Sequence, residues 1–338
     1  MNKKRAFLYF GLIVILILLF ACISAILGSV RIPLLNVWRI LLGDRTDLMQ
    51  TNIICNIRLP RIVAAILLGG ALSLSGYLLQ TFFGNPVVGP FVLGISSGAK
   101  LTVALTMIAL LKKGKELGQN MMILAAFTGS LLAMMFVLLI SVRVKSMSVL
   151  VVCGIMIGYI CSAVTDFVVT FADDSNIVNL HNWSMGSLSG VKWDELRAVC
   201  VIVSLCFLLC VFLVKPMSAY RLGEAYARSA GVHVILLRIL LVFVSCLLAA
   251  CVTAFAGPIS FVGIAVPHLV RSILKTDAPH LMIPAGFLGG ALVTMFCDAI
   301  ARTAFAPTEV SISSVTAVLL VPVVILMLIG RNRKRSEI

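Results

Sequence analysis

The sequence predicts an all-α membrane protein with about ten transmembrane helices. Of its 338 residues, 61% are hydrophobic and only 12% are charged, and the mean hydropathy is +1.13. A soluble domain of ordinary composition would carry about 25% charged residues. The apolar runs have the length of membrane-spanning helices, and they lack the alternation of a membrane β-barrel strand. These observations indicate a polytopic helical protein that is embedded in the lipid bilayer.

The apolar segments can be placed in order along the chain. The first follows a basic N-terminus and is about 22 residues long, which exceeds the usual signal-peptide core and predicts an uncleaved span. An outer connection, residues 28–57, contains a short interfacial helix expected from Leu34 to Leu42. The expected spans are residues 6–27, 59–81, 92–111, 121–141, 147–171, 195–214, 235–255, 257–274, 281–301 and 311–330.

The net charge of +14 is best explained by membrane orientation. An even number of spans puts both termini on one side, and a cytoplasmic placement gives that side the larger share of Lys and Arg. No basic face interleaved with aromatic residues occurs, so nucleic acid is not an expected partner. All of the 10 cysteines except Cys55 fall within apolar spans, and no CxxC pair occurs, so we expect buried thiols that act as small hydrophobic groups.

Two breaks interrupt the apolar pattern. Asn85, Pro86 and Pro90 end the second span, and Gly257 and Pro258 follow the seventh. Broken backbone at membrane depth is tolerated only where protein buries it or where it lines a cavity. The span order puts the two breaks on opposite sides of the membrane, which is typical of an inverted repeat of spans 2–5 and 7–10. Chance similarity between two apolar segments is the alternative.

The inner connection, residues 215–234, contains the segment LGEAYARSAG, with glycine near both ends. This pattern predicts a short helix bounded by chain breaks. From the pattern alone, a protruding contact element and an ordinary capped loop are equally good interpretations. The chain has no GxxxxGK[ST] motif, so its energy must come from a partner chain or an ion gradient. No metal-ligand spacing and no nucleophile–base pair predict a catalytic site, a metal site or a cofactor.

Several motifs occur in one order from about Leu34 to the C-terminus. They are RLPR at 58–61, SLSGYLLQ at 73–80, NPVVGPFVLGISSGA at 85–99, WSMGSLSG at 183–190, LGEAYARSAGV at 222–232, AGPISFVGIAVPHLVR at 256–271 and CDAIAR at 297–302. With these motifs the chain resembles the permease subunits of type II ABC importers for iron-siderophores, haem and vitamin B12, the FecCD-type transport family.

The resemblance implies a single ten-helix permease domain over residues 1–338, in a bacterial cytoplasmic membrane with both termini in the cytoplasm. It also implies a partner set: a second permease copy or a homologous permease, two ABC ATPase subunits, and an extracytoplasmic solute-binding protein. ATP hydrolysis then belongs to a partner chain, so this chain is expected to be a transport subunit and not an enzyme.

The resemblance further assigns roles to individual residues. In the connection 215–234, the expected ATPase-coupling residues are Leu222, Gly223, Glu224, Ala227 and Gly231. The expected docking residues for the binding protein are Arg58, Arg61 and Arg302, for which simple snorkelling at helix ends is the alternative. Ser146 and Ser148 are gate candidates because the family narrows its pathway in this region, and small hydroxyl residues in a tight turn are the equal alternative. Lys100 is a pathway candidate on its own chemistry, as an ionisable residue within a span. Pro267 and His268 match a motif near the cytoplasmic end of a span and are expected to be structural or to serve coupling.

Two features depart from the family pattern. Lys100 stands where the family usually has a small residue, and the last span keeps Glu309 and Pro322 but lacks the usual glycines. The resemblance therefore does not carry a particular substrate over to this chain. The competing hypothesis is an ion-coupled secondary transporter, which should place paired ionisable residues at mid-membrane. Lys100 and Asp166 are the intramembrane candidates, and they are far apart in the sequence.

Overall fold

The computed structural model describes residues 3–336, apart from Ser29, Arg45, residues 112–117, Lys145 and Pro307. Within these ranges the protein is all-helical and has no strand. The elements are α1 (Lys3–Ile26), α2 (Leu34–Leu41), α3 (Leu48–Asn52), the π-helical η1 (Ile53–Arg58), α4 (Leu59–Phe83), the 3-10 helix η2 (Pro90–Leu93), α5 (Ile95–Leu111), α6 (Gln119–Arg143), α7 (Met147–Val169), α8 (Asp174–Ser184), α9 (Trp193–Tyr220), α10 (Glu224–Ser229), α11 (Val234–Ala256), α12 (Val262–Leu274), α13 (Pro279–Thr303) and α14 (Ile312–Ser336).

The helical prediction is confirmed. In the described part of the chain, 7 helical segments are long and apolar enough to cross a membrane, and three shorter apolar helices add to them at Ile95–Leu110, Val262–Leu274 and Ile312–Leu326. Each of the ten expected apolar segments corresponds to one of these helices, with ends that differ by a few residues. How many of the three shorter helices cross the bilayer stays a prediction.

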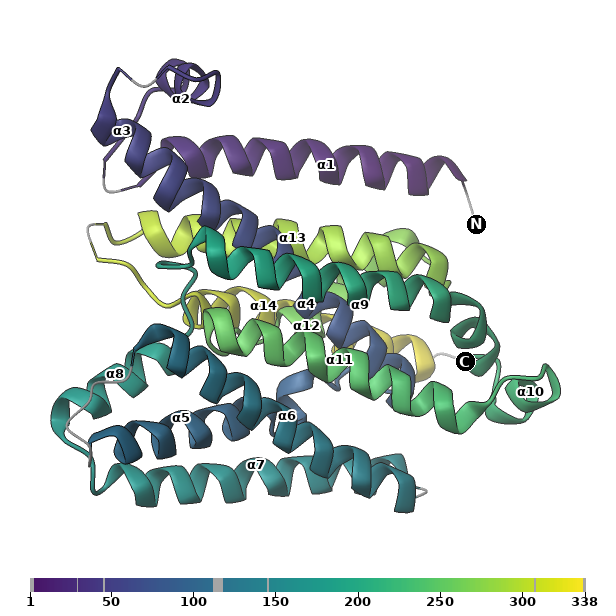
Figure 1. Cartoon of the computed structure of the whole chain (residues 1–338). Coiled ribbons are helices and arrows are strands. Elements are labelled where there is room, and N and C mark those ends of the chain that lie inside the picture. The colour runs from purple at the N-terminus through teal and green to yellow at the C-terminus, as the bar shows by residue number, and fades with distance from the viewer. Residues whose placement is uncertain are drawn as a thin grey trace.

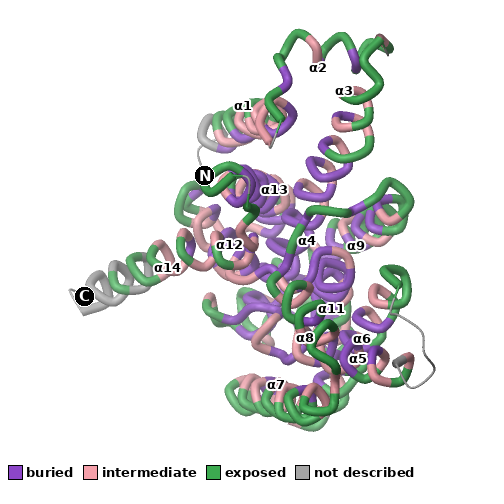
Figure 2. Tube along the Cα trace, turned by 90° about the vertical axis from the view of Figure 1, so that its left-hand side faces the viewer, coloured by how far each residue is buried: buried purple, intermediate pink, exposed green. Residues whose placement is uncertain are grey.

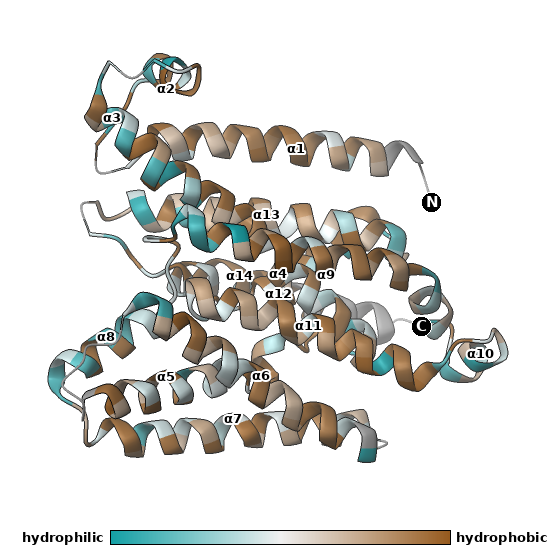
Figure 3. Ribbon diagram, viewed as in Figure 1, coloured by the Kyte–Doolittle hydropathy of each residue, from teal (hydrophilic) through white to brown (hydrophobic). Residues whose placement is uncertain are grey.

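The long helices run alongside one another, with polar elements gathered at two ends (Figure 1). At one end lie α2, α3 and α8, which we call the α8 end. At the other lie α10, the start of α1 and the later part of α14, which we call the α10 end. The shared position of the start of α1 and the later part of α14 agrees with an even number of crossings. Figure 3 shows polar residues at both ends and apolar residues along the shafts of the helices between them.

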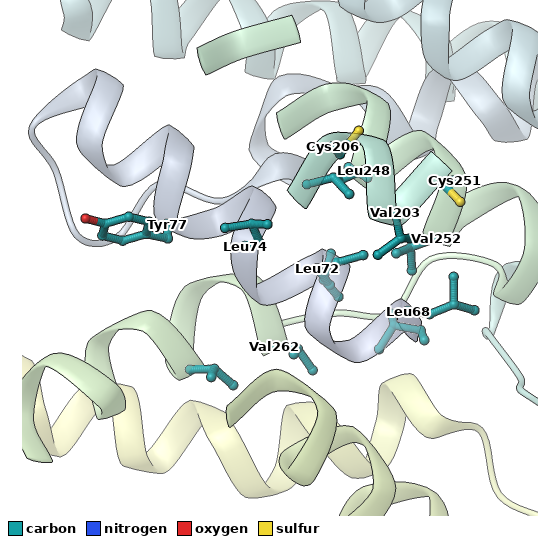
Figure 4. Close-up of a cluster of buried hydrophobic side chains, with 14 of the residues drawn as sticks. Leu68, Leu72, Leu74, Tyr77, Val203, Cys206, Leu248, Cys251, Val252 and Val262 are labelled. Carbon is teal, nitrogen blue, oxygen red and sulfur yellow. The ribbon is translucent and has the colours of Figure 1, made fainter. Parts of the chain in front are cut away.

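The core lies around α4, which packs against α13, α11 and α12. Figure 2 shows buried residues concentrated on α4, α11 and α13, whereas α7 is largely exposed. Leu68 and Leu72 of α4 meet Val203, Leu248 and Val252 from α9 and α11 in this core (Figure 4). Since lipid tails are as apolar as these side chains, close packing and not apolar burial alone must hold the helices together.

Small residues allow that packing. A Cβ atom placed on Gly76 of α4 would overlap the carbonyl group of Gly263, and one placed on Gly290 of α13 would overlap the backbone of Gly69. The backbones of α4, α12 and α13 therefore come closer than any larger residue would allow. This explains the glycine-rich run in the second span.

The two predicted breaks lie at opposite ends of the molecule. Helix α4 ends at Gly84 in a left-handed conformation (φ +62°), and this residue lines a pocket together with Glu224 at the α10 end. Helix α11 ends at Gly257 (φ +71°), which lies against Trp183 at the close of α8. The placement agrees with the inverted repeat expected from the sequence.

The details of the first break follow from its residues. Asn85 accepts a hydrogen bond from the backbone N–H of Val87 (3.0 Å), and Pro86 cannot donate a backbone hydrogen bond that would extend the helix. Pro90 begins η2, and Pro258, at the other break, accepts a hydrogen bond from the hydroxyl of Ser313. These bonds give the broken backbone partners inside the protein.

Two elements differ from expectation. Helix α8 lies between the fifth and sixth expected spans, residues 147–171 and 195–214, where the polar composition gives no apolar run that would predict a span. Helix α9 continues to Tyr220, beyond the predicted end at residue 214, although Pro216 lies inside it. Both differences concern helical turns outside the apolar segments, where hydropathy carries no information.

Candidate functional site

Helix α10 is a compact helix that protrudes from one end of the bundle. Gly223 before it and Gly231 after it have φ angles of +123° and +81°, and a Cβ atom on either would meet no atom within 4 Å. The glycines are therefore needed for backbone conformation and not for close packing. The N–H of Ala227 donates to the carbonyl of Gly223 (2.9 Å), and the N–H of Val232 donates to the carbonyl of Ala227 (2.9 Å).

One face of α10 rests on the protein and the other is open. Ala227 is fully buried, whereas Leu222 is 70% exposed and Tyr226 is 54% exposed. Leu222 and Tyr226 are therefore accessible to a partner chain at the protruding end of the protein. The geometry thus favours the contact-element interpretation of this segment over the ordinary capped loop.

Glu224 connects α10 to its neighbours. Its Oε1 accepts a hydrogen bond from Nη2 of Arg228, one turn further along α10 (2.6 Å), and its Oε2 accepts one from Nη2 of Arg238 on α11 (2.7 Å). The Nε of Arg238 donates to the hydroxyl of Tyr220 (3.2 Å), and its guanidinium lies 5.8 Å from the centre of the Tyr220 ring. Glu224 therefore joins α10 to the end of α9 and the start of α11.

A second acidic residue, Asp277, lies in the connection between α12 and α13. Its carboxylate accepts a hydrogen bond from Nε of Arg271 on α12 (2.6 Å) and pairs with Arg221 at the end of α9. Sequence reasoning did not single out Asp277, Arg238 or Arg221. An acidic residue in the short connection after the basic end of a helix, where Arg271 and Lys275 lie, is the pattern that could have found Asp277.

Both acidic residues line one pocket of about 830 Å³ at the α10 end. The last turn of α4 and the chain break after it, including Gly84 and Pro86, form another wall. Met147, which lies between the gate candidates Ser146 and Ser148, and His268 also line this pocket. The structure thus brings together residues from the predicted coupling segment, the first break, the PHLVR motif and the start of α7.

Lys100 lies away from this group, half-buried on α5. Ser146 and Ser148 are exposed at the start of α7, where Ser146 is the residue preceding the helix. Asp166 is exposed near the other end of α7. Asp166 and Lys100 therefore do not form the pair of buried ionisable groups that an ion-coupled transporter would need.

The three arginines expected to dock a binding protein are buried. Arg58 donates to the backbone carbonyls of Ala25 (2.5 Å), Ile26 (3.0 Å) and Val30. Its side chain therefore fixes the end of α1 and the chain that follows to the start of α4. The residue itself is only 4% exposed.

Arg61 and Arg302 share the buried carboxylate of Asp298. Arg61 lies 2.9 Å from Asp298 and 3.0 Å from Glu309, and Arg302 lies 3.3 Å from Asp298 and donates to Ser24. Arg58, Arg61, Arg302 and Glu309 line a recess of about 190 Å³. The buried carboxylate of Asp298, the carboxylate of Glu309 and backbone carbonyls thus contact these charges from within the protein, and a docking role stays a prediction.

Histidines, acidic residues and cysteines are the side chains that a metal site would require. Among the residues that the structure describes, no group of 3 or more His, Cys, Asp and Glu side chains could hold a metal ion. The ten cysteines are free thiols, and Cys206, Cys210, Cys246, Cys251 and Cys297 are buried in the helix bundle. Their positions in the core agree with a packing role.

A bundle of long apolar helices with two chain breaks defines the chain as a polytopic helical membrane protein. A family model described as the FecCD transport family matches residues 15–330. The chain belongs to this family, in agreement with the motifs found in its sequence. It is a permease subunit of an ABC importer.

Individual relatives agree with this assignment. The chain is 30% identical over 330 residues to the hemin transport system permease protein HmuU of Yersinia pestis, covering 97% of each chain. It is 34% identical over 291 residues to the vitamin B12 import system permease protein BtuC of Salmonella typhi, covering 86% of this chain and 88% of BtuC.

Among solved structures, a metal-chelate type ABC transporter in an inward-facing conformation matches with a TM-score of 0.83 and 27% identity, covering 96% of this chain and 99% of that one. A chain from the structure of PsaBC from Streptococcus pneumoniae shares the fold with a TM-score of 0.54 at 16% identity.

Proposed function

We propose that this permease imports a metal chelate, such as an iron-siderophore, haem or cobalamin, into the bacterial cytoplasm. The observation that carries the proposal is the match over nearly the whole chain to a metal-chelate type transporter, with a TM-score of 0.83. The names of the haem and vitamin B12 relatives support the same substrate class. The altered last span leaves the choice within that class open, because its glycines differ from the family pattern.

We further infer the assembly in which the chain works. Two permease copies, or this chain and a homologous permease, form the membrane unit, two ATPase subunits bind at the α10 end, and a solute-binding protein docks at the α8 end. Support comes from the exposed Leu222 and Tyr226 around α10. Further support comes from α7, which is the least covered of the middle helices and leaves an apolar face for a second subunit.

The residues then take these roles. Leu222, Gly223, Glu224, Ala227 and Gly231 form the ATPase-coupling element, and the α10 end faces the cytoplasm together with both termini. Arg58, Arg61 and Arg302 hold the outer ends of α1, α4 and α13 in the shape that a binding protein meets. This chain carries out no covalent chemistry, because ATP hydrolysis belongs to the partner subunits.

Transport proceeds by alternating access. ATP-driven closure of the ATPase pair moves the two α10 helices, and that motion re-orients the helices around the pathway. In the present arrangement the pocket of about 830 Å³ lies at the α10 end. Ser146 and Ser148 lie beside it, which supports their candidacy as gate residues. Lys100 on α5 is a candidate for a position in the pathway further from the α10 end.

The test uses the complete complex in lipid vesicles, with the cognate ATPase and binding protein, and with haemin, cyanocobalamin and a ferric hydroxamate as separate probes. ATP should drive uptake of one probe. Gly223→Trp should abolish stimulated ATP hydrolysis, because the backbone of a residue with a bulky side chain does not readily adopt φ +123°. Gly118→Trp is the matched control, since Gly118 also has open space around it but has φ −68° and immediately precedes α6 at the α8 end.

Uptake that follows an ion gradient without ATP would instead favour a secondary transporter. Equal loss of hydrolysis in both tryptophan variants would remove α10 from its coupling role.

A further inference from the structure

The side chain of Glu224 is the polar connection between α10 and the rest of the protein. Within α10, which the structure describes in full, Arg228 and Ser229 make hydrogen bonds only to residues of the same helix. Glu224 alone reaches another helix through its side chain, at Arg238 of α11 (2.7 Å). The remaining attachment of α10 is the buried methyl group of Ala227 and the two glycine-bounded chain ends.

A second connection lies two residues before Gly223. Arg221, at the end of α9, pairs with Asp277, and Asp277 also accepts a hydrogen bond from Arg271 of α12 (2.6 Å). The entry to α10 is thus tied to α11 through Glu224 and to α12 through Asp277. The segment that leaves α10 after Ser229 has no side-chain ion pair among those that the structure describes.

We propose that Glu224 and Asp277 are positioning residues that transmit the motion of α10 to α11 and α12, through the Glu224–Arg238 and Arg221–Asp277–Arg271 ion pairs. The proposal rests on the proposed function and adds the route by which movement of α10 reaches the helices packed on α4. Helices α11 and α12 both contact α4, which ends in the chain break at Gly84.

The exposure of these groups suits ion pairs that rearrange at little cost in stability. The side chains of Glu224, Arg238 and Asp277 are 36%, 29% and 35% exposed. Partly exposed ion pairs contribute little net stability, because water screens them and competes for them. Loss of one pair should therefore leave the fold and the assembly intact and should act on the transmission of movement. Arginine suits this connection, because its planar guanidinium can bind two partners at once, as Arg238 does with Glu224 and Tyr220.

The experiment separates transmission from folding and assembly. Complexes with the cognate ATPase and binding protein are reconstituted with Glu224→Gln, Arg238→Gln or Asp277→Asn, and two rates are measured in the same vesicles. One rate is ATP hydrolysis, and the other is ATP-driven uptake of the probe that the wild-type complex imports. We expect normal co-purification of the ATPase and an uptake per ATP that falls between about 2-fold and about 30-fold.

Arg228→Gln is the matched control, because it removes an equally short ion pair of Glu224 that stays within α10. Its uptake per ATP should equal that of the wild type. Exchanging the charges, with Glu224→Lys and Arg238→Glu in an Arg228→Gln background, should recover part of the loss seen with Arg238→Gln. A purely structural role would lower hydrolysis and uptake together and would change the recovered amount of complex.

The outcomes are distinguishable. An unchanged uptake per ATP in all three variants, with wild-type uptake present, would overturn the inference and leave the proposed function standing. A loss in Arg228→Gln equal to that in Arg238→Gln would also overturn it. The absence of ATP-driven uptake in the wild-type complex would overturn the proposed function, and the inference with it.

Discussion

Asp298 is the residue whose replacement should most disturb the α8 end of the protein. Its carboxylate is 3% exposed and compensates two buried guanidinium groups, those of Arg61 and Arg302. Removing one partner of a buried ion pair leaves an uncompensated charge and costs about 3–5 kcal/mol. For Asp298→Asn we expect the lower end of that range, about 3 kcal/mol, because Glu309 still lies 3.0 Å from Arg61.

Glu309→Gln provides the comparison. The side chain of Glu309 is 41% exposed, so water can replace much of what it offers, and the expected loss is about 1 kcal/mol or less. Both variants remove one negative charge and keep the side-chain shape, so the difference between them reports the burial of Asp298 together with its second guanidinium partner. The measurement is thermal or denaturant-induced unfolding of the purified permease in detergent, followed by gel filtration of the remaining folded protein.

Asp298→Asn should lower the midpoint of unfolding clearly more than Glu309→Gln. The reverse order, or equal midpoints, would refute the reasoning, because it would mean that the buried carboxylate does not carry the charge compensation. Arg302→Gln in the Asp298→Asn background should restore part of the loss, since it removes one of the charges left without a partner.

Two further predictions concern helix packing. Gly76→Ala should destabilise the protein by more than about 3 kcal/mol in the same unfolding assay, because the added Cβ overlaps the carbonyl of Gly263. Gly286→Ala is the control and should be nearly neutral, because the atom nearest to its added Cβ, Ser73 Oγ, lies 3.5 Å away. Equal stability of the two variants would contradict the close approach of α4 and α12. Tyr9→Phe should cost about 0.6 kcal/mol, a usual value for one hydrogen bond between membrane helices, since the Tyr9 hydroxyl donates to the carbonyl of Ala285 (3.1 Å) and joins α1 to α13. A change of several kcal/mol would show that Tyr9 does more than join these helices.

Much of this fold could be predicted because hydropathy reports directly on helices that lie in lipid. The ten apolar segments, the breaks at Pro86 and Pro258 and the glycines around α10 follow from residue type alone. Helix α8 was missed because its polar residues give no such pattern. Its helical start follows Asp173, and its side chains line a pocket of about 640 Å³ with residues of α5, α6 and α11. Only tertiary packing shows that this segment is ordered as a helix.

The arginines show where sequence reasoning about a site fails. Arg58, Arg61 and Arg302 stand at the ends of predicted spans, where a charge could face water, a lipid headgroup or a partner protein. The decisive partners, Asp298 and Glu309, lie more than two hundred residues further along the chain than Arg61. Arg302 lies one helical turn after Asp298, but no local pattern links Arg61 to Asp298 and Glu309, so the burial and the charge compensation of Arg61 could be recognised only from the packed helices. The α10 segment was easier, because its glycines and its position in one connection are local features.

The two ends of the protein hold their charges in different ways, and this difference bears on how the permease moves. At the α8 end, the carboxylate of Asp298 is 3% exposed, so separating its partners would leave charges in an environment with little water. At the α10 end, Glu224 and Asp277 are 36% and 35% exposed, and water can take the place of an arginine during a rearrangement. The barrier to relative helix motion should therefore be lower at the α10 end. Motion that begins at α10 can then pass through α11 and α12 while the buried cluster keeps the opposite ends of α1, α4 and α13 together.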